Sequence, residues 1–417
     1  MSDITHVSTT FSSGTDALLG AVQVQAIVLG NDDYFVVAGA SGALLDLYKF
    51  ENDTLQLVDR LDTVAAFGLY ILSGVSVLDM SGGGTLAVPT GLGPNHPNFL
   101  TITQHGFEIL SESETISQTN FKSVAEPIEF SDDVLIVGTG VSGGGLEVLS
   151  VATDGALKPF ASVDDTDDIA LGNVTSVTSA ELGGDTFLFA VSSFDAGLSS
   201  FEILENGTLS LVDTVLPTDG SGFSLPTVVV TVDVGASQFL VMASAGSGNL
   251  TSFKIGAHGD LTEMDQVLDS GTSRFADASV LEGFSYGDRG FVVAAGSDDG
   301  FTLFEVGPFG ELFHLLDVVD DFGTALQNIA DLEVVLNGSV AQITAVSGTD
   351  HGISVFEVDV ATLSPDAVIA CIFLTNFGPL EAAALTDHPM EPQANVAPDM
   401  AGSVVPIVDD IDFWYLI

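Results

Sequence analysis

Basic residues are the scarcest component of this sequence. Of 417 residues only 7 are Lys or Arg, against 58 Asp and Glu, so the formal net charge is −51 at pH 7. Nucleic acids and anionic lipids bind proteins mainly through Lys and Arg. The charge balance therefore excludes both as partners. It favours cation binding or function in salty water, where separated charges are screened.

Cysteine and long apolar runs are also scarce. The one cysteine, Cys371, excludes an internal disulfide framework. No apolar run approaches the ~20 residues that span a bilayer, and the first residues lack the basic and apolar regions of an N-terminal secretory signal. We therefore expect no membrane span, and a protein that stays inside the cell or leaves it without such a signal.

What the sequence does contain is a repeat with a period of about 51 residues. A bulky residue recurs in every copy, and in most copies a turn glycine follows six residues later, as Gly155 and Gly259 do. The spacings between the bulky residues are 52, 49, 52, 52, 51 and 52. These residues are Tyr48, Leu100, Leu149, Phe201, Phe253, Phe304 and Phe356.

Each copy contains four short runs in which apolar and polar residues alternate. In the fifth copy they cover residues 225–234, 238–245, 249–255 and 261–268. Such runs, separated by Asp-Gly and Asn-Gly turns, mark antiparallel strands. The sequence thus predicts an all-β fold, a seven-bladed β-propeller of four-stranded antiparallel blades. The predicted blade limits within a domain of residues 1–370 are about 20–63, 64–114, 115–166, 167–218, 219–270, 271–321 and 322–370.

The two ends of the chain lie outside the regular copies. A ring of blades exposes its first and last edges unless one chain end closes it. Residues 4–12 resemble a fourth strand, so we predict that Ile4–Phe11 closes the last blade, with Ser364–Ala370 as the alternative. Residues 371–417 form a non-repeat tail that ends in acidic residues and a short apolar terminus, Asp409–Ile417.

Ligand sites of propellers usually lie on the face that carries the inter-blade loops and the loops between second and third strands. In this sequence those loops are strongly acidic, which suggests a rim that binds Ca²⁺ through hard oxygen ligands. Short Asp, Gly and Ser turns are also what hairpins of an acidic protein contain, so both interpretations stay open. The candidate calcium ligands are Asp164, Asp165, Asp298, Asp299 and Asp350.

Two further residues in these loops are candidates for catalysis. His96, in the segment Gly-Pro-Asn-His-Pro, is a possible general base or metal ligand. Arg274 is suited to hold a substrate carboxylate. A structural or solvent role for the histidine, and charge neutralisation by the arginine, are the alternatives.

The segments Gly300–Val306 and Gly352–Val358 share a Gly-x-x-x-Phe-Glu-Val pattern. Because of this pattern and the four-stranded repeat, residues 4–370 resemble the lactonase-type seven-bladed propellers related to 6-phosphogluconolactonase. The resemblance implies hydrolysis of a small lactone over the central channel, with His96 and Arg274 as its site residues. Such enzymes are expected to line the site with several basic residues, whereas Arg274 stands here among carboxylates.

In its acidity the chain is also similar to the propeller regions of bacterial RTX-type secreted calcium-binding proteins, although their glycine-rich nonapeptides are missing. The tail resembles the C-terminal signals of type I secretion substrates, and the alternative is a strand that packs on the propeller or on a neighbour. We therefore predict a non-catalytic extracellular module for binding, adhesion or surface assembly. Its partner would be a cell surface, a glycan or a second copy of the chain. A lactonase-like hydrolase and a cytoplasmic protein of a salt-loving organism are the alternatives.

Overall fold

The computed structural model describes most of the repeat region. The described residues are 4–80, 84–92, 99–110, 125–130, 133–139, 144–152, 157–206, 208–217 and 222–364. The chain divides into two units, Met1–Val368 and Ile369–Ile417. The second unit, and with it the predicted tail 371–417, lies outside the described residues.

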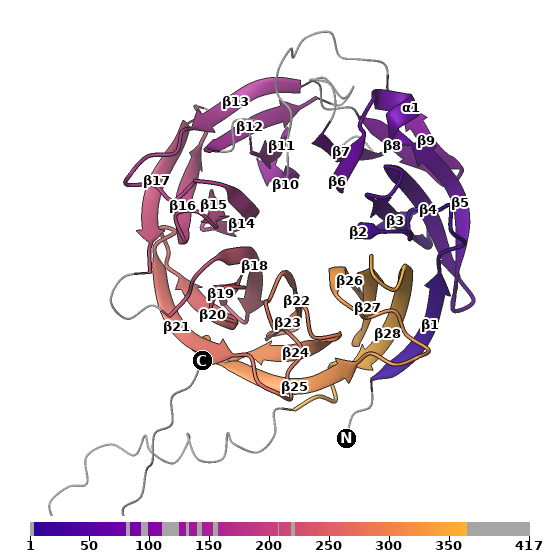
Figure 1. Ribbon diagram of the computed structural model, residues 1–417. Helices are drawn as coiled ribbons and strands as arrows, with labels where there is room; N and C mark the ends of the chain where they lie inside the picture. The colour runs from indigo at the N-terminus through magenta and orange to yellow at the C-terminus, as the bar shows by residue number, and fades with distance from the viewer. Residues whose placement is uncertain are drawn as a thin grey trace, which may run out of the picture. The chain divides into compact units, whose positions relative to one another are not determined.

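The first unit is a ring of seven four-stranded antiparallel sheets (Figure 1). Blade 1 consists of β2 (Ala21–Leu29), β3 (Asp32–Gly39), β4 (Leu44–Glu51) and β5 (Thr54–Asp62), and the short helix α1 (Thr63–Phe67) follows it. Blade 2 consists of β6 (Ile71–Asp79), β7 (Thr85–Leu92), β8 (Leu100–Thr103) and β9 (Gly106–Ile109). Blade 3 consists of β10 (Ala125–Phe130), β11 (Asp133–Gly138), β12 (Leu146–Val151) and β13 (Leu157–Val163). Blade 4 consists of β14 (Val174–Leu182), β15 (Asp185–Ser192), β16 (Gly197–Leu204) and β17 (Thr208–Val215).

The remaining blades follow the same order. Blade 5 consists of β18 (Pro226–Val234), β19 (Ser237–Ser244), β20 (Asn249–Ile255) and β21 (Leu261–Leu268). Blade 6 consists of β22 (Val280–Tyr286), β23 (Arg289–Ala295), β24 (Gly300–Val306) and β25 (Leu312–Val319). Blade 7 consists of β26 (Ile329–Asn337), β27 (Val340–Ser347), β28 (Gly352–Asp359) and β1 (Thr5–Phe11). The predicted fold class is confirmed.

The ring is closed by the N-terminal strand. β1 pairs with β28 in antiparallel register, from Thr5 opposite Glu357 to Phe11 opposite Gly352. The hydroxyl groups of Thr9 and Ser354 are hydrogen-bonded at 2.9 Å across this pair. The predicted closing strand at the N-terminus is thus confirmed as the fourth strand of the last blade. It covers the edge that would otherwise be exposed between the last and first blades.

The hydrophobic core is divided among the seams between blades. Among the described residues seven buried clusters occur, one between each pair of neighbouring blades, and Phe239 and Phe304 belong to the cluster between blades 5 and 6. Because both faces of a blade pack on neighbours, the second strands are buried almost throughout. Such strands show continuous apolar runs instead of alternation.

The repeated bulky residue marks an irregularity in most blades. In blades 1, 3, 4, 5 and 6 the register between third and fourth strands shifts directly before this residue, as it does between Ser200 and Phe201. A β-bulge increases the local twist of a strand pair. The repeat therefore fixes the shape of the blade as well as its core.

Aspartates on the fourth strands join successive blades. The carboxylate of Asp213 accepts a hydrogen bond from the backbone N–H of Leu261 at 3.0 Å, and that of Asp265 accepts one from Leu312 at 2.9 Å. Asp59 accepts from Phe107 in the same way. Part of the acidic composition is thus structural, because these carboxylates provide acceptors for backbone N–H groups on the fourth strand of the next blade.

Arg289 holds the chain that follows β28. Its guanidinium forms two hydrogen bonds with the Glu305 carboxylate, both 2.7 Å, and donates to the carbonyl oxygens of Val360 and Leu363. It also lies 4.9 Å from the centroid of the Phe291 ring. The last described residues are thereby fixed to blade 6. No helix in the described part of the chain has the length and apolarity needed to cross a membrane.

Candidate functional site

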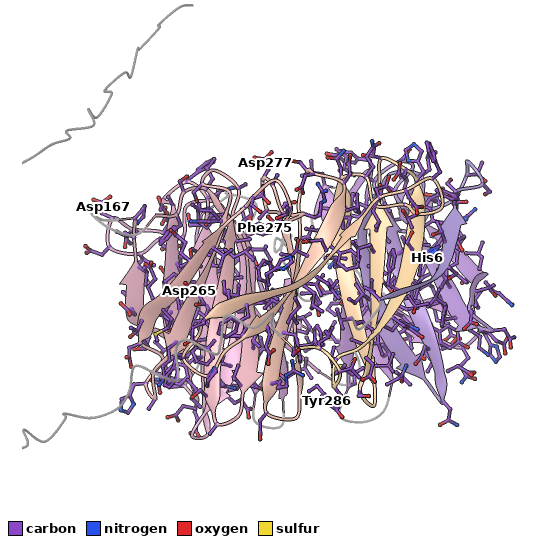
Figure 2. All side chains as sticks on the ribbon, turned by 90° about the horizontal axis from the view of Figure 1, so that it is seen from below. His6, Asp167, Asp265, Phe275, Asp277 and Tyr286 are labelled. Carbon is purple, nitrogen blue, oxygen red and sulfur yellow. The ribbon has the colours of Figure 1, made fainter. Side chains whose placement is uncertain are left out.

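The two faces of the propeller differ in the loops they carry. We call the side with the inter-blade loops and the loops between second and third strands the loop face, and the opposite side the turn face. Figure 2 shows Asp167 and Asp277, both in inter-blade loops, at one edge and Tyr286, at the end of β22, at the other. The predicted site residues that the structure describes all belong to loops of the loop face.

Four of the five predicted calcium ligands accept hydrogen bonds from backbone N–H groups of inter-blade loops, which for Asp165 is its own loop and for the other three a neighbouring loop. These bonds join Leu171 N to Asp165 at 3.1 Å, Ala276 N to Asp298 at 3.2 Å, Asn328 N to Asp299 at 3.3 Å and Gln327 N to Asp350 at 2.8 Å. Asp164 is exposed. No group of three or more metal-ligating side chains occurs among the described residues. The calcium site stays a prediction, which calorimetric titration with Ca²⁺ tests.

Asp298 is the predicted ligand whose protonation is most altered. Burial raises the pKa of its carboxyl above the ordinary value, as does the nearby Asp269. The backbone hydrogen bond from Ala276 and the charge of Arg274 act in the opposite direction. Burial is the largest of these effects, so the pKa is raised on balance.

A polar side chain on the third strand anchors the inter-blade loop in several blades. Ser199 accepts from the backbone N–H of Ala170 at 3.1 Å, and Ser354 accepts from Ala325 at 2.8 Å. In blade 6 Thr302 accepts from the N–H of Arg274 at 2.7 Å. The loops of the loop face are therefore held from inside the blades, which is the kind of rigid support that a recognition surface needs.

In blade 1 the same position carries a buried charge, Asp46. Its side chain has no exposed surface, and it accepts from the N–H of Ala17, from the hydroxyl of Tyr48 and from the guanidinium of Arg60. Arg60 also donates to the carbonyl oxygen of Thr15 at 2.6 Å. Burial and the adjacent carboxylate of Asp46 raise the pKa of the Tyr48 hydroxyl. This network fixes the loop that connects the closing strand to blade 1.

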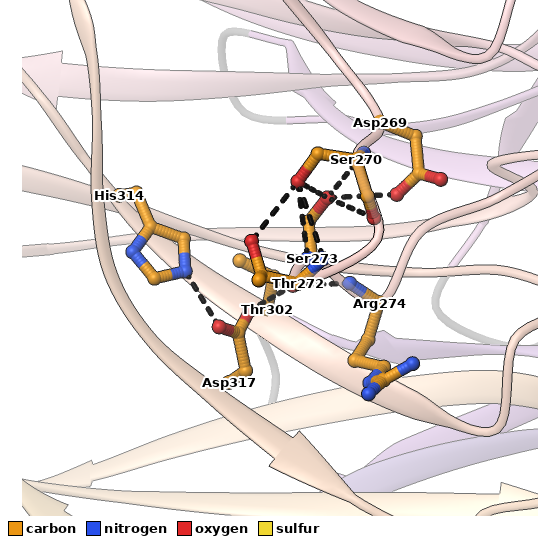
Figure 3. Close-up of polar contacts among 8 residues, drawn as sticks. All are labelled: Asp269, Ser270, Thr272, Ser273, Arg274, Thr302, His314 and Asp317. Carbon is orange, nitrogen blue, oxygen red and sulfur yellow. Dashed lines mark hydrogen bonds and ion pairs between the residues drawn. The ribbon is translucent and has the colours of Figure 1, made fainter.

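Arg274 is held by its backbone, while its side chain points away from the polar contacts around it. Figure 3 shows the guanidinium directed away from the hydrogen-bonded group that includes Ser273, Thr302 and Asp317. Its Nε atom is buried and has no hydrogen-bond partner. The ion pairs found in the described part of the chain involve Lys49, Arg60, Arg289 and His314, and Arg274 is not among them.

The polar group beside Arg274 contains a hydroxyl, a carboxylate and an imidazole in an order that does not suit nucleophilic catalysis. The Asp317 carboxylate accepts from the Thr302 hydroxyl and contacts His314 Nε2, both at 2.8 Å. A catalytic triad needs the imidazole next to the hydroxyl, so that it can remove the proton. Thr302 is also fully buried. The arrangement therefore supports the loop instead of activating a nucleophile.

His96 lies outside the described residues, as does the whole Gly-Pro-Asn-His-Pro segment. Its predicted role as a general base or metal ligand therefore stays a prediction. The described part of the loop face contains His351, which is exposed.

Carboxyl groups on the first strands form a second acidic region, which the sequence analysis missed. The first strands lie nearest the centre of the ring, which we call the central channel (Figure 1). Burial raises the pKa of Glu126 to about 8 and that of Asp331 to about 7. Burial and the neighbouring Asp331 raise the pKa of Glu333 to about 8, and burial with repulsion from Glu333 raises that of Glu282. The signal available in the sequence was an acidic residue at an alternating position of the first strand.

Large apolar side chains are exposed on the loop face. Phe194, in the loop between β15 and β16, is 81% exposed, and Phe322, in the loop between β25 and β26, is fully exposed at 110%. Each stands next to aspartate, Asp195 for the first and Asp321 for the second. Further exposed apolar residues on this face are Phe11, Val64, Tyr70, Ile71, Leu92, Leu216, Leu225, Leu268 and Val319.

Comparison with known proteins identifies the fold and no family. No family model matches the chain, and no curated protein matches it. A crystal structure of a protein from Lactobacillus plantarum is similar over 76% of this chain and 92% of its own, with a TM-score of 0.51 and 16% identity. A functionally unknown protein from Desulfotomaculum acetoxidans matches over 74% and 84%, with a TM-score of 0.44 and 14% identity. At such identities the likeness concerns the propeller alone, and the lactonase and RTX resemblances stay predictions.

Proposed function

We propose that the protein is a non-catalytic binding module whose loop face docks a polypeptide that carries both apolar and basic side chains. One observation carries the proposal, the full exposure of aromatic side chains beside carboxylates on that face. Phe194 and Phe322 leave most of their ring surface in water. Together with the further exposed apolar side chains of the loop face, they offer apolar surface that a partner can cover.

The chemistry of the partner follows from the loops around these rings. Aromatic side chains are the usual anchors of protein interfaces, where they fill pockets in the partner. Asp320 and Asp321 directly precede Phe322, and Asp195 directly follows Phe194. With a net charge of −51 the whole chain attracts cations, so electrostatic attraction accelerates the encounter with a basic partner and repels an acidic one.

The proposal predicts that the double variant Phe194→Ser/Phe322→Ser binds a basic amphipathic peptide of alternating Lys and Leu at least tenfold more weakly than the wild type. Loss of two anchors costs about 2–4 kcal/mol, which is tenfold or more in affinity. Isothermal titration calorimetry at two salt concentrations measures this.

Phe309 provides the matched control, because it is 68% exposed in the turn between β24 and β25 on the turn face. Phe309→Ser is expected to bind like the wild type. Equal weakening in both variants would show that the peptide adheres to the charged surface at large, and the docking proposal would then be wrong.

We further propose that the protein acts outside the cell, in adhesion or surface assembly, and that Asp409–Ile417 directs its export. The acidic composition and the resemblance of the tail to type I secretion signals support this proposal. A chain without residues 409–417 is expected to stay inside the cells, while the full chain is found in the medium. Equal secretion of both chains would contradict the export role of the tail.

A lactonase-like hydrolase is the second candidate, and one observation favours it. Arg274 on the loop face has a buried Nε without a hydrogen-bond partner and is in none of the ion pairs found among the described residues, and a guanidinium is suited to hold a substrate carboxylate. Hydrolysis of a lactone that disappears in both His96→Ala and Arg274→Met would establish this function. Absence of turnover across a panel of lactones would dismiss it.

A further inference from the structure

A polar cavity of about 510 Å³ opens between three successive blades at the turn-face end of their first strands. Its volume is within the range of small-ligand sites. It lies far from the loops discussed above, because its residues belong to the ends of first strands and the starts of second strands. The lining residues are Ser179, Ala180, Glu181, Thr186, Thr231, Asp233, Gln238, Gly283, Phe284 and Ser285.

A variation in the repeat lies beside the cavity. Ser179, Thr231 and Gly283 occupy equivalent positions 52 residues apart in blades 4, 5 and 6. A Cβ atom at Gly283 would lie 2.8 Å from the carbonyl oxygen of Thr231, so this close approach of blade 6 to blade 5 requires glycine. A smaller cavity of about 390 Å³ lies at the same end of the first strands of blades 7, 1 and 2, but its lining is more apolar, with Ile27, Val28 and Leu336 among its residues.

The polar groups of the cavity are held in place and offer acceptors. Gln238 donates from Nε2 to the Asp233 carboxylate at 2.8 Å. This contact fixes the amide, and its Oε1 atom is buried without a hydrogen-bond partner. Ser285 is tied to the backbone of Asp233 by two hydrogen bonds, at 2.9 and 3.1 Å. The acceptors that a ligand can reach are the carboxylates of Asp233 and Glu181, which are exposed and line the cavity.

An aromatic ring completes the lining. Phe284 is partly buried and stacks on Phe291, with the ring centroids 5.2 Å apart and an interplanar angle of 16°. The stacking holds the ring at a fixed orientation in the cavity wall. A ligand that fits must therefore combine hydroxyl donors for Asp233 and Glu181 with an apolar patch for Phe284.

We propose that this cavity binds a neutral saccharide of one or two sugar units. A pyranose has hydroxyl groups that donate to carboxylate and amide oxygens, and C–H groups on its faces that pack on an aromatic ring. Anionic sugars are disfavoured because Glu181 and Asp233 lie at the rim. The site is independent of the proposed docking function, since it lies on the other face and shares no residue with it.

The test is saturation-transfer NMR of the full chain with glucose, galactose, mannose and their disaccharides at about 10 mM, where even millimolar affinity is detected. At least one sugar is expected to bind, and its affinity is expected to fall at least tenfold in Gln238→Leu and in Phe284→Leu. Glucuronic acid is expected to bind much more weakly than the neutral sugar.

Gln56→Leu is the matched control, because Gln56 is exposed on β5 of blade 1, outside the cavity. It is expected to leave sugar binding unchanged. Thermal unfolding of each variant separates loss of binding from loss of folding. Binding of no neutral sugar by the folded wild type would overturn the proposal. So would sugar binding that survives both cavity variants, or a cavity that takes spermidine and no sugar.

Discussion

Replacement of Asp46 by alanine is expected to lower the free energy of unfolding by about 3–5 kcal/mol, the usual loss when one partner of a buried ion pair is removed. Asp46 is fully buried and is the acceptor for Ala17 N, Tyr48 Oη and two nitrogens of Arg60. The variant leaves these donors without their shared acceptor. It also releases the loop that leads from the closing strand to blade 1. Urea denaturation measures the change.

Asp32→Ala is the control for this variant, because it removes one negative charge and one ion pair from the same blade. The Asp32 carboxylate contacts Lys49 at 3.0 Å, but its side chain is 46% exposed. Exposed ion pairs contribute only about 0–1 kcal/mol. Similar losses in the two variants would mean that the buried network adds nothing beyond its charge, contrary to our interpretation.

The second large effect is expected at the channel carboxyl group of Glu126. Its pKa is raised to about 8 by burial alone. A raised pKa means that the folded state binds the proton more tightly than the unfolded state does, so the stabilising contribution is fully present below about pH 4 and is lost as the pH rises through about 8. Glu126→Gln has no proton to lose. It is therefore expected to be more stable than the wild type by about 4 kcal/mol at about pH 9, and by less than about 1 kcal/mol at about pH 5.

Glu108→Gln separates this effect from the general benefit of one negative charge fewer. Glu108 is exposed on β9, away from the channel. Its replacement is expected to change stability by the same small amount at both pH values. Thermal unfolding of the three proteins across this range checks the prediction. A gain for Glu126→Gln that is equal at both ends of the range would contradict a burial-raised pKa.

The repeat made the fold predictable, because the bulky residue of each copy and the turn glycine after it recur at nearly constant spacing. Phe201 and Phe253 lie in the third strands β16 and β20, next to the bulges that shape each blade. The closing strand was harder to predict. Two segments had a suitable pattern, and only the pairing of β1 with β28 distinguishes them.

The functional residues were less predictable, because a carboxylate looks the same in sequence whether it holds a backbone N–H, lines a channel or faces solvent. Asp298 and Asp350 occupy the predicted loops, but their hydrogen bonds to Ala276 and Gln327 depend on how the neighbouring loop folds back. Glu126 alternates like a solvent-facing strand residue. Only closure of the ring places it in a confined channel, where water cannot fully solvate its charge.

Closure by β1 has a consequence for synthesis of the chain. Ser354, the hydrogen-bonding partner of Thr9, is separated from it by 345 residues along the chain. At a synthesis rate of about 5–20 residues per second, β1 therefore waits roughly 20–70 s on the ribosome before β28 has been made. During that time its backbone is an unpaired template for other strands. Thr, Ser and His fill most of Thr5–Phe11, which keeps the waiting strand polar and so protects the nascent chain from aggregation.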